Sequence, residues 1–221
     1  MAAIAASKGV TGALDVLEGP AGMGAAMSGN ADWRKATSGL GEIYNIEAIT
    51  FKNHGCCGHT FAAIDGLLFI MQDAQITAND IANIAIATYG PAISITDRVD
   101  PQTPQECKFS MQYVLAHAAH YGSVRIEAFE AERMSDPAIQ AMLGQIDLSI
   151  DPAVDAEFPA RRAAHVTITT KDGRQLTHYQ PTRKGDPDLP LTDDELEAKF
   201  IELANPVLGN ELTNSLLQKL W

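Results

Sequence analysis

The stretch FKNHGCCGHTFAAIDG (residues 51–66) holds a dense group of side chains with chemical potential. One lysine, two histidines and two adjacent cysteines fall within the eight positions from Lys52 to His59. Residues of these types occur in metal centres, in reactive-thiol sites, and in anion-binding pockets where a lysine is the working group. The choice among these three sites decides what class of protein this is.

A metal centre would draw on His54, Cys56, Cys57 and His59, with Cys107 as a further ligand. Zinc sites usually separate paired cysteines by two to four residues and combine two such pairs, whereas these two cysteines are adjacent and a second pair is missing. A thiol nucleophile at Cys56 or Cys57 would need a base and an orienting group, and small buried cysteines are more common. We therefore expect no metal and treat both sites as minor alternatives.

The lysine offers a different chemistry. Lys52 follows a predicted short strand at residues 44–51 and precedes a glycine-containing loop and a predicted helix at 59–74. A helix N-terminus carries unpaired N–H groups and a partial positive charge, so a lysine beside it makes a good carboxylate receptor. The alternative is a solvated lysine at a strand end, which spacing alone favours.

A second group of polar residues lies on the predicted helix at residues 108–122. Tyr113, His117 and His120 are spaced by four and then three residues, so they share one face of that helix. A tyrosine near a cation can act as an acid or base if its pKa falls. The alternative, which spacing alone favours, is a half-buried polar stripe.

Composition narrows the possible partners of this 221-residue chain. Its net charge of −12 disfavours nucleic acid and anionic membrane surfaces, so an acidic ligand would need a local basic cluster. Two short basic segments could form such a cluster, and the alternative is that their charges are simply solvated. Their basic residues are Arg161, Arg162, Arg183 and Lys184. The sequence has no apolar run of about 18 residues and no signal-peptide pattern at its start. Three cysteines make no disulfide framework, which predicts a reducing cytoplasm.

The remaining segments predict a mixture of helices and antiparallel strands without a regular strand–helix–strand rhythm, which indicates the α+β class. Two alternating runs around Asp172-Gly173 predict a β-hairpin. Further predicted elements are an alanine-rich helix at 2–8 ended by Gly9, a strand through Ile84 and Ile86, a proline-containing loop at 98–107, a helix at 136–145 capped by Asp136, and a C-terminal helical section opened by the capping box Thr192 and Glu195.

Four segments together resemble the MmgE/PrpD family. They are FKNHGCCGHTFAAIDG, CKFSMQYVLAHAAHYG, TTKDG and RKGDPDLPLTDDELEAKF, and they occur in the order and rough spacing of that family. The segment GVTGALDVLEGPAGM also resembles the family's link between its helical domain and its lid. The similarity runs through nearly the whole chain and is weakest after residue 207. The family includes 2-methylcitrate dehydratase, cis-aconitate decarboxylase and iminodisuccinate epimerase.

The resemblance implies a domain organisation. Family members are about twice as long as this chain and consist of an all-helical domain and a smaller α+β lid. By this resemblance residues 1–43 are expected to be a remnant of the helical domain with a linker. Residues 44–190 are expected to form the lid, a small antiparallel sheet with packed helices, and residues 191–221 to return to the helical domain. The chain would then correspond to the C-terminal half of such a protein.

The resemblance also implies site residues. The lysine of the family's FK segment falls on Lys52 and the tyrosine of its FS-x-x-Y helix on Tyr113, so both are expected to be catalytic. His54, His59 and Lys184 are the expected substrate-binding residues. The sequence departs from the family at Phe61, where many relatives have a histidine directly after the threonine.

The implied function is that of a metal-independent lyase without a cofactor, a dehydratase or decarboxylase of a small di- or tricarboxylic acid. The histidines and aspartate that are catalytic in the family precede the region covered here. The chain is therefore expected to be inactive without a helical N-terminal half, supplied as a chain or domain in a homo- or hetero-oligomer. The alternatives are an isomerase or epimerase of a dicarboxylate, and a non-catalytic module that binds carboxylates or a protein.

Overall fold

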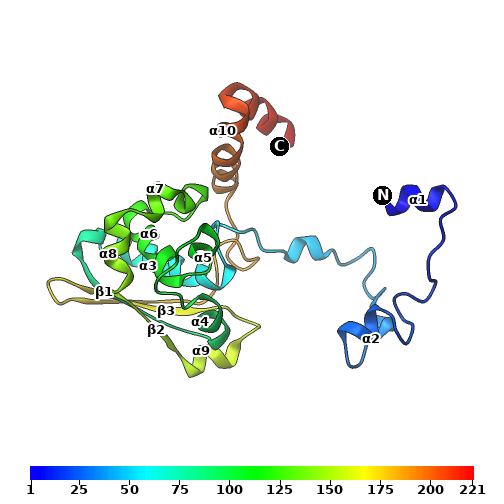
Figure 1. Cartoon of the computed structure of the whole chain (residues 1–221), viewed down its shortest axis with the longest axis horizontal. Coiled ribbons are helices and arrows are strands. Elements are labelled where there is room, and N and C mark those ends of the chain that lie inside the picture. Colours follow the sequence, from blue (N-terminus) through cyan, green and yellow to red (C-terminus); the bar gives the residue numbers. More distant parts are fainter. The chain divides into compact units, whose positions relative to one another are not determined.

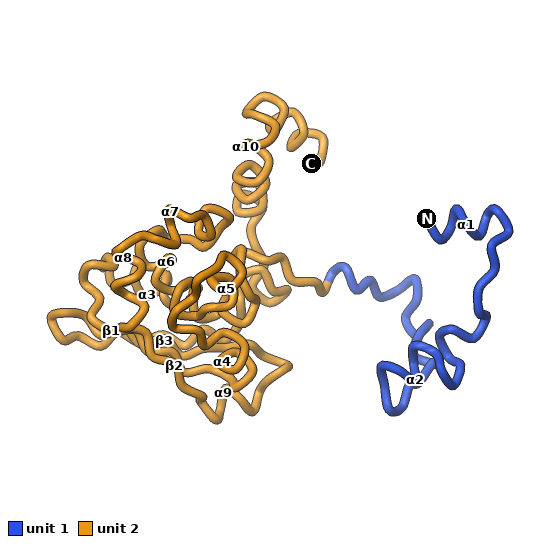
Figure 2. The backbone as a smooth tube through the Cα atoms, viewed as in Figure 1, with its two compact units in different colours: residues 1–47 blue, residues 48–221 orange.

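The computed structural model describes residues 1–221, and the chain separates into two compact units, residues 1–47 and 48–221 (Figure 2). The division lies close to the expected boundary after residue 43. The C-terminal helix groups with residues 48–221 rather than forming a third unit. That residues 1–43 and 191–221 belong to a helical domain stays a prediction.

The first unit contains little regular structure. Helix α1 (Ala2–Ser7) is followed by Gly9 at φ +87°, as the sequence predicts. Helix α2 (Met23–Met27) is only five residues long. Its close packing involves glycine: a Cβ on Gly24 would lie 2.5 Å from the Trp33 ring. The predicted strand at 44–51 is wrong, because residues Asn45–Ala48 form a 3₁₀ turn with no partner strand.

The second unit is built on a four-stranded sheet in the order β2-β1-β3-β4. The strands are β1 (Ile81–Thr88), β2 (Ile146–Ile150), β3 (Ala164–Thr170) and β4 (Gln175–Gln180). Pairs β1–β3 and β3–β4 are antiparallel, and the second is the predicted hairpin around Asp172-Gly173. Strand β2 pairs parallel with β1, which the long helical crossover between them permits. The α+β class is confirmed, and the sheet is mixed rather than antiparallel throughout.

Helices cover one face of this sheet (Figure 1). Helix α3 (Phe61–Asp73) packs on β3 and β4 and against α6 (Met111–Tyr121), which in turn packs against α8 (Pro137–Leu143). The inward residues of β1 and β3 alternate with partly exposed ones, so isoleucines such as Ile84 and Ile168 fill the core between sheet and helices. Shorter helices complete the unit: α4 (Gly90–Thr96), α5 (Pro104–Lys108), α7 (Ala131–Met134) and α9 (Pro152–Glu157). Single 3₁₀ turns occur at Trp33–Lys35, Gly58–Thr60, Ala78–Asp80 and Ile126–Phe129.

The C-terminal helix α10 (Asp193–Leu220) begins at the predicted capping box, in which Thr192 and Glu195 each satisfy the other's backbone N–H. Gly209 interrupts it with φ 75° and ψ 162°, three residues after Pro206, so the helix bends there (Figure 1). The first part of α10 reaches the loop that carries Lys52 and therefore contributes to the candidate site.

Candidate functional site

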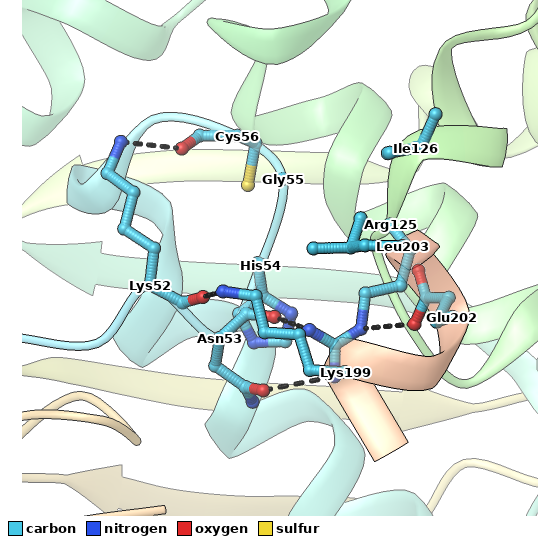
Figure 3. Close-up of a pocket in the computed structure, with 10 residues that line it drawn as sticks. All are labelled: Lys52, Asn53, His54, Gly55, Cys56, Arg125, Ile126, Lys199, Glu202 and Leu203. Carbon is cyan, nitrogen blue, oxygen red and sulfur yellow. Dashed lines mark hydrogen bonds and ion pairs between the residues drawn. The ribbon is translucent and has the colours of Figure 1, made fainter. Parts of the chain in front are cut away.

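A cavity of about 270 Å³ opens beside Lys52 in the second unit (Figure 3). Three segments distant in the sequence enclose it: the loop Lys52–Cys56, the pair Arg125–Ile126 that begins a 3₁₀ turn, and one face of α10. Its volume suits a small molecule rather than a macromolecule.

Three backbone hydrogen bonds fix the loop around Lys52 to different parts of the fold. The bonds are Phe51 N–H to Gly185 O at 2.9 Å, Gly55 N–H to Val124 O at 2.8 Å, and Cys57 N–H to Lys108 O at 2.9 Å. The predicted helix at 59–74 follows directly as α3, which anchors the end of the loop in the core. Lys52 therefore projects from a loop whose backbone is held on both sides.

The contact with Gly185 leaves no room for a side chain. Gly185 has φ +100°, and a Cβ at this position would lie 2.0 Å from the carbonyl oxygen of Phe51. Both the positive φ and the close approach require glycine. Next to it, Thr50 and Arg183 both hydrogen-bond the Asp186 carboxylate, at 2.6 and 2.8 Å, which fixes this turn beneath the Lys52 loop.

Three cations and one carboxylate line the cavity. The Lys52 ammonium lies 3.5 Å from the Cys56 carbonyl oxygen, a long hydrogen bond that leaves it available to an anion. Arg125 donates to the backbone and side chain of Asn53, and its Nε lies 3.4 Å from Glu202 Oε2. Lys199 reaches from α10 to donate to the Lys52 carbonyl oxygen. These contacts appear together in Figure 3.

This arrangement makes the cavity locally positive in a protein of net charge −12. Burial lowers the pKa of Lys199; the Arg125 guanidinium lowers it further, Glu202 opposes this, and Lys52 adds to it. A lysine whose charge is disfavoured by neighbouring cations gains when an anion binds among them. The site can therefore hold and neutralise carboxylates.

His54 is buried between this cavity and a second one of about 400 Å³ that Lys184 also lines. Its Nε2 lies 3.0 Å from one oxygen of Asp65, and the other oxygen of Asp65 accepts the Lys184 backbone N–H at 2.8 Å. His54 Nδ1 is buried without a partner. The Lys184 ammonium is paired with Glu195 at 2.9 Å, so that lysine is less available to a ligand than Lys52.

The structure does not bring His59 or Tyr113 into the Lys52 cavity. His59 Nδ1 lies 2.8 Å from the Tyr89 hydroxyl, and burial together with Arg162 and Arg183 lowers its pKa. Tyr113 is fully buried, and its hydroxyl donates to the Ala128 carbonyl oxygen.

Burial also raises the pKa of Tyr113, so the phenol stays protonated at neutral pH. Of the five expected site residues, Lys52 and His54 share one cavity and Lys184 is linked to it through Asp65. The functional roles assigned to all five stay predictions.

The cysteines have structural surroundings. All three are free thiols, and burial raises the pKa of Cys56 to about 12 and that of Cys107 to about 11. A thiol whose ionisation is disfavoured in this way is a poor nucleophile. No group of three or more His, Cys, Asp or Glu side chains lies close enough together to hold a metal ion.

Sequence reasoning missed three residues of the site: Arg125, Lys199 and Glu202. Arg125 follows the end of α6 in a segment with no distinctive pattern, so nothing local indicated it. Lys199 and Glu202 lie three positions apart after the predicted capping box, and this spacing places them on one helix face. That signal was present, but which face would meet the Lys52 loop depends on tertiary packing.

Fold and site together define this chain as an α+β protein with a cationic cavity where a loop meets a helix. A family model for the MmgE/PrpD C-terminal domain matches residues 54–221, and the chain belongs to this family. It is 26% identical over 156 residues to cis-aconitate decarboxylase of Mus musculus, and the matched region covers 71% of this chain and 31% of that protein.

Two bacterial relatives carry another name. The chain is 32% identical over 105 residues to 2-methylcitrate dehydratase of Cupriavidus necator, covering 45% of this chain and 22% of that enzyme. It is 29% identical over 133 residues to the protein of the same name from Escherichia coli strain K12, covering 57% and 28%. The matched regions thus span less than a third of each of these relatives.

None of the helices is both long and apolar enough to traverse a membrane.

Proposed function

We propose that this chain supplies the carboxylate-binding part of a lyase, a dehydratase or decarboxylase, that acts on a small di- or tricarboxylic acid. The observation that carries the proposal is the cavity that is lined by three cations, Lys52, Arg125 and Lys199, and by a single carboxylate, Glu202. The names of the relatives support the reaction class, since they are decarboxylases and dehydratases.

In this proposal Lys52 binds a substrate carboxylate through a charge-assisted hydrogen bond, a contact worth about 1.5–3 kcal/mol. Removing a proton beside a carboxylate, or losing carbon dioxide from one, leaves an electron pair on a carbon atom of a molecule that is already anionic. In a dehydration this electron pair forms the double bond as the hydroxide departs with the electrons of the C–O bond. The cations of the cavity accelerate such a step only to the extent that they interact more strongly with the developing charge than with the substrate.

The acid–base groups of the reaction are proposed to lie mainly on a helical N-terminal half, present as another chain or domain in a homo- or hetero-oligomer. Within the cavity described here, the groups that could accept a proton are the Glu202 carboxylate and the buried His54 Nδ1, and neither is proposed as the acid or base of the reaction. Tyr113 stays a proposed proton donor, a role that its raised pKa allows and that would require its hydroxyl to leave Ala128. A cytoplasmic location is proposed from the three free thiols.

The test compares Lys52→Ala with Lys171→Ala, which removes the same charge from an exposed turn of the hairpin. We expect Lys52→Ala to weaken binding of tricarballylate to the chain by about tenfold, as loss of one charged hydrogen bond implies. Lys171→Ala should leave it unchanged, and both variants should melt like the parent. If calorimetry showed that both variants bind tricarballylate equally well, Lys52 would not be a ligand-binding residue of the site.

Turnover is tested separately by co-expression with a helical partner of the family. We expect the assembled protein to convert 2-methylcitrate or cis-aconitate and the isolated chain to be inactive. Full activity of the isolated chain would contradict the need for the missing half. Binding without turnover in any assembly would instead favour the non-catalytic carboxylate-binding module. Epimerase activity toward a dicarboxylate is a further outcome of the same assay.

A further inference from the structure

The single carboxylate in the Lys52 cavity is incompletely neutralised. Glu202 Oε2 lies 3.4 Å from Arg125 Nε, beyond an ordinary hydrogen bond. Its other oxygen, Oε1, is buried without a partner. Arg125 in turn directs its terminal nitrogens to Asn53 rather than to Glu202. Glu202 is therefore not consumed by a tight salt bridge, and its negative charge acts on whatever enters the cavity.

The charges of the cavity determine how many ligand carboxylates it can balance. Lys52, Arg125 and Lys199 contribute three positive charges and Glu202 one negative charge, which leaves two. A ligand with two carboxylates would balance this excess, whereas a third carboxylate at the same place would meet Glu202 directly. Charges a few ångströms apart in a partly enclosed site interact by several times more than in bulk water.

We infer that Glu202 is a specificity-determining residue that restricts this cavity to ligands presenting two carboxylates. The inference rests on the proposed function, because it names the charge class of acid that the same cavity accepts. The third carboxylate of a tricarboxylic acid would meet the negative charge of Glu202, which lowers the affinity of the cavity for that acid. Glu202 acts through the field it places on the bound acid and takes no part in bond breaking.

The experiment replaces Glu202 by Gln, which keeps the shape and one acceptor oxygen but removes the charge. The matched control is Glu211→Gln, the same change on an exposed side chain of the same helix, outside the cavity. Propionate, succinate and tricarballylate serve as probes with one, two and three carboxylates at pH 8. Their binding to the full 221-residue chain is measured by calorimetry or by NMR titration, and circular dichroism checks that the variants are folded.

The expected result is a gain in affinity that grows with the charge of the probe. If Glu202→Gln tightens tricarballylate by about tenfold, proportionality to charge gives about fivefold for succinate and about twofold for propionate. Glu211→Gln should change none of them, since a distant exposed charge is screened by salt.

Two results would overturn the inference in distinguishable ways. If the parent binds succinate but Glu202→Gln changes all three probes by the same factor, or not at all, Glu202 does not set the charge preference and the carboxylate cavity itself stands. If neither the parent nor the Glu202→Gln variant binds any of the probes, the cavity is no carboxylate site, and the proposed function falls together with this inference.

Discussion

At the scale of single residues, Tyr113 joins two different roles. The family resemblance implies a catalytic phenol, while the structure places its hydroxyl in the core as a donor to the Ala128 carbonyl oxygen. A buried carbonyl that loses its donor costs about 1–3 kcal/mol. The phenol therefore contributes to stability whatever it does in a reaction.

We predict that Tyr113→Phe lowers the free energy of unfolding by about 1–3 kcal/mol, because Ala128 loses its buried partner. Urea denaturation measures this directly. Tyr179→Phe is the control, because Tyr179 lies on β4 with 37% of its surface exposed. This substitution should change the free energy of unfolding by no more than about 0.5 kcal/mol. Equal stability of the two variants would show that the Tyr113 hydroxyl does not hold the core, and a loss of turnover in the assembled protein would then be attributable to catalysis alone.

At the scale of elements, the position of Lys52 depends on a turn far away in the sequence. Gly185 sits at φ +100° directly beneath the Phe51 carbonyl, so the 183–186 turn and the Lys52 loop touch backbone to backbone. A methyl group at this position must push the two segments apart. The loop would then carry Lys52 away from Arg125 and Lys199.

We predict that Gly185→Ala costs more than about 2 kcal/mol of stability and also weakens tricarballylate binding, because it adds a steric clash to an unfavourable φ. Gly173→Ala separates the two effects. Gly173 has a similar φ of +87° but nothing within 4 Å of an added Cβ, so it should cost about 1 kcal/mol and leave binding unchanged. Denaturation and titration of both variants test this. Equal losses in stability and binding would mean that the contact with Phe51 does not position Lys52.

The elements that sequence reasoning found are those whose signals are local. The hairpin around Asp172-Gly173, the caps at Asp136 and Thr192, and the end of α6 at Gly122 each depend on a few neighbouring residues, and all are confirmed. Strand β2 was missed, because its parallel pairing with β1 comes from a crossover that no short segment encodes. The expected strand at 44–51 failed for the complementary reason: an apolar, β-prone run becomes a strand only where a partner is available.

The same distinction applies to the site. Lys52 and His54 lie in one short motif, so the sequence pointed to them together. Arg125 and Glu202 join them only through the packing of a 3₁₀ turn and a distant helix, which periodicity cannot specify. Conversely, helical spacing correctly grouped Tyr113 with His117 but left open whether that face met solvent or core, and both side chains are buried.

At the scale of the whole molecule, the core belongs to one of the two units. Every residue of the hydrophobic core cluster lies between Cys56 and Ile168, within the unit 48–221, whereas the buried positions of residues 1–47 are glycines. Folding free energy comes chiefly from burying apolar side chains. The unit 48–221 therefore contains what is needed to fold, and it also contains the whole Lys52 cavity.

We predict that a chain of residues 48–221 melts within about 2 °C of the full chain and binds succinate with the same affinity, since neither the core nor the cavity uses residues 1–47. Calorimetry provides both quantities on one sample. A chain of residues 61–221 serves as the contrasting variant: it keeps α3 but loses Lys52 and the loop hydrogen bonds, so it should lose binding. If removing residues 1–47 alone lowered the melting temperature by 10 °C or more, or abolished binding, the first unit would contribute to the fold or the site, and the unit 48–221 could not be treated as independent of the segment before it.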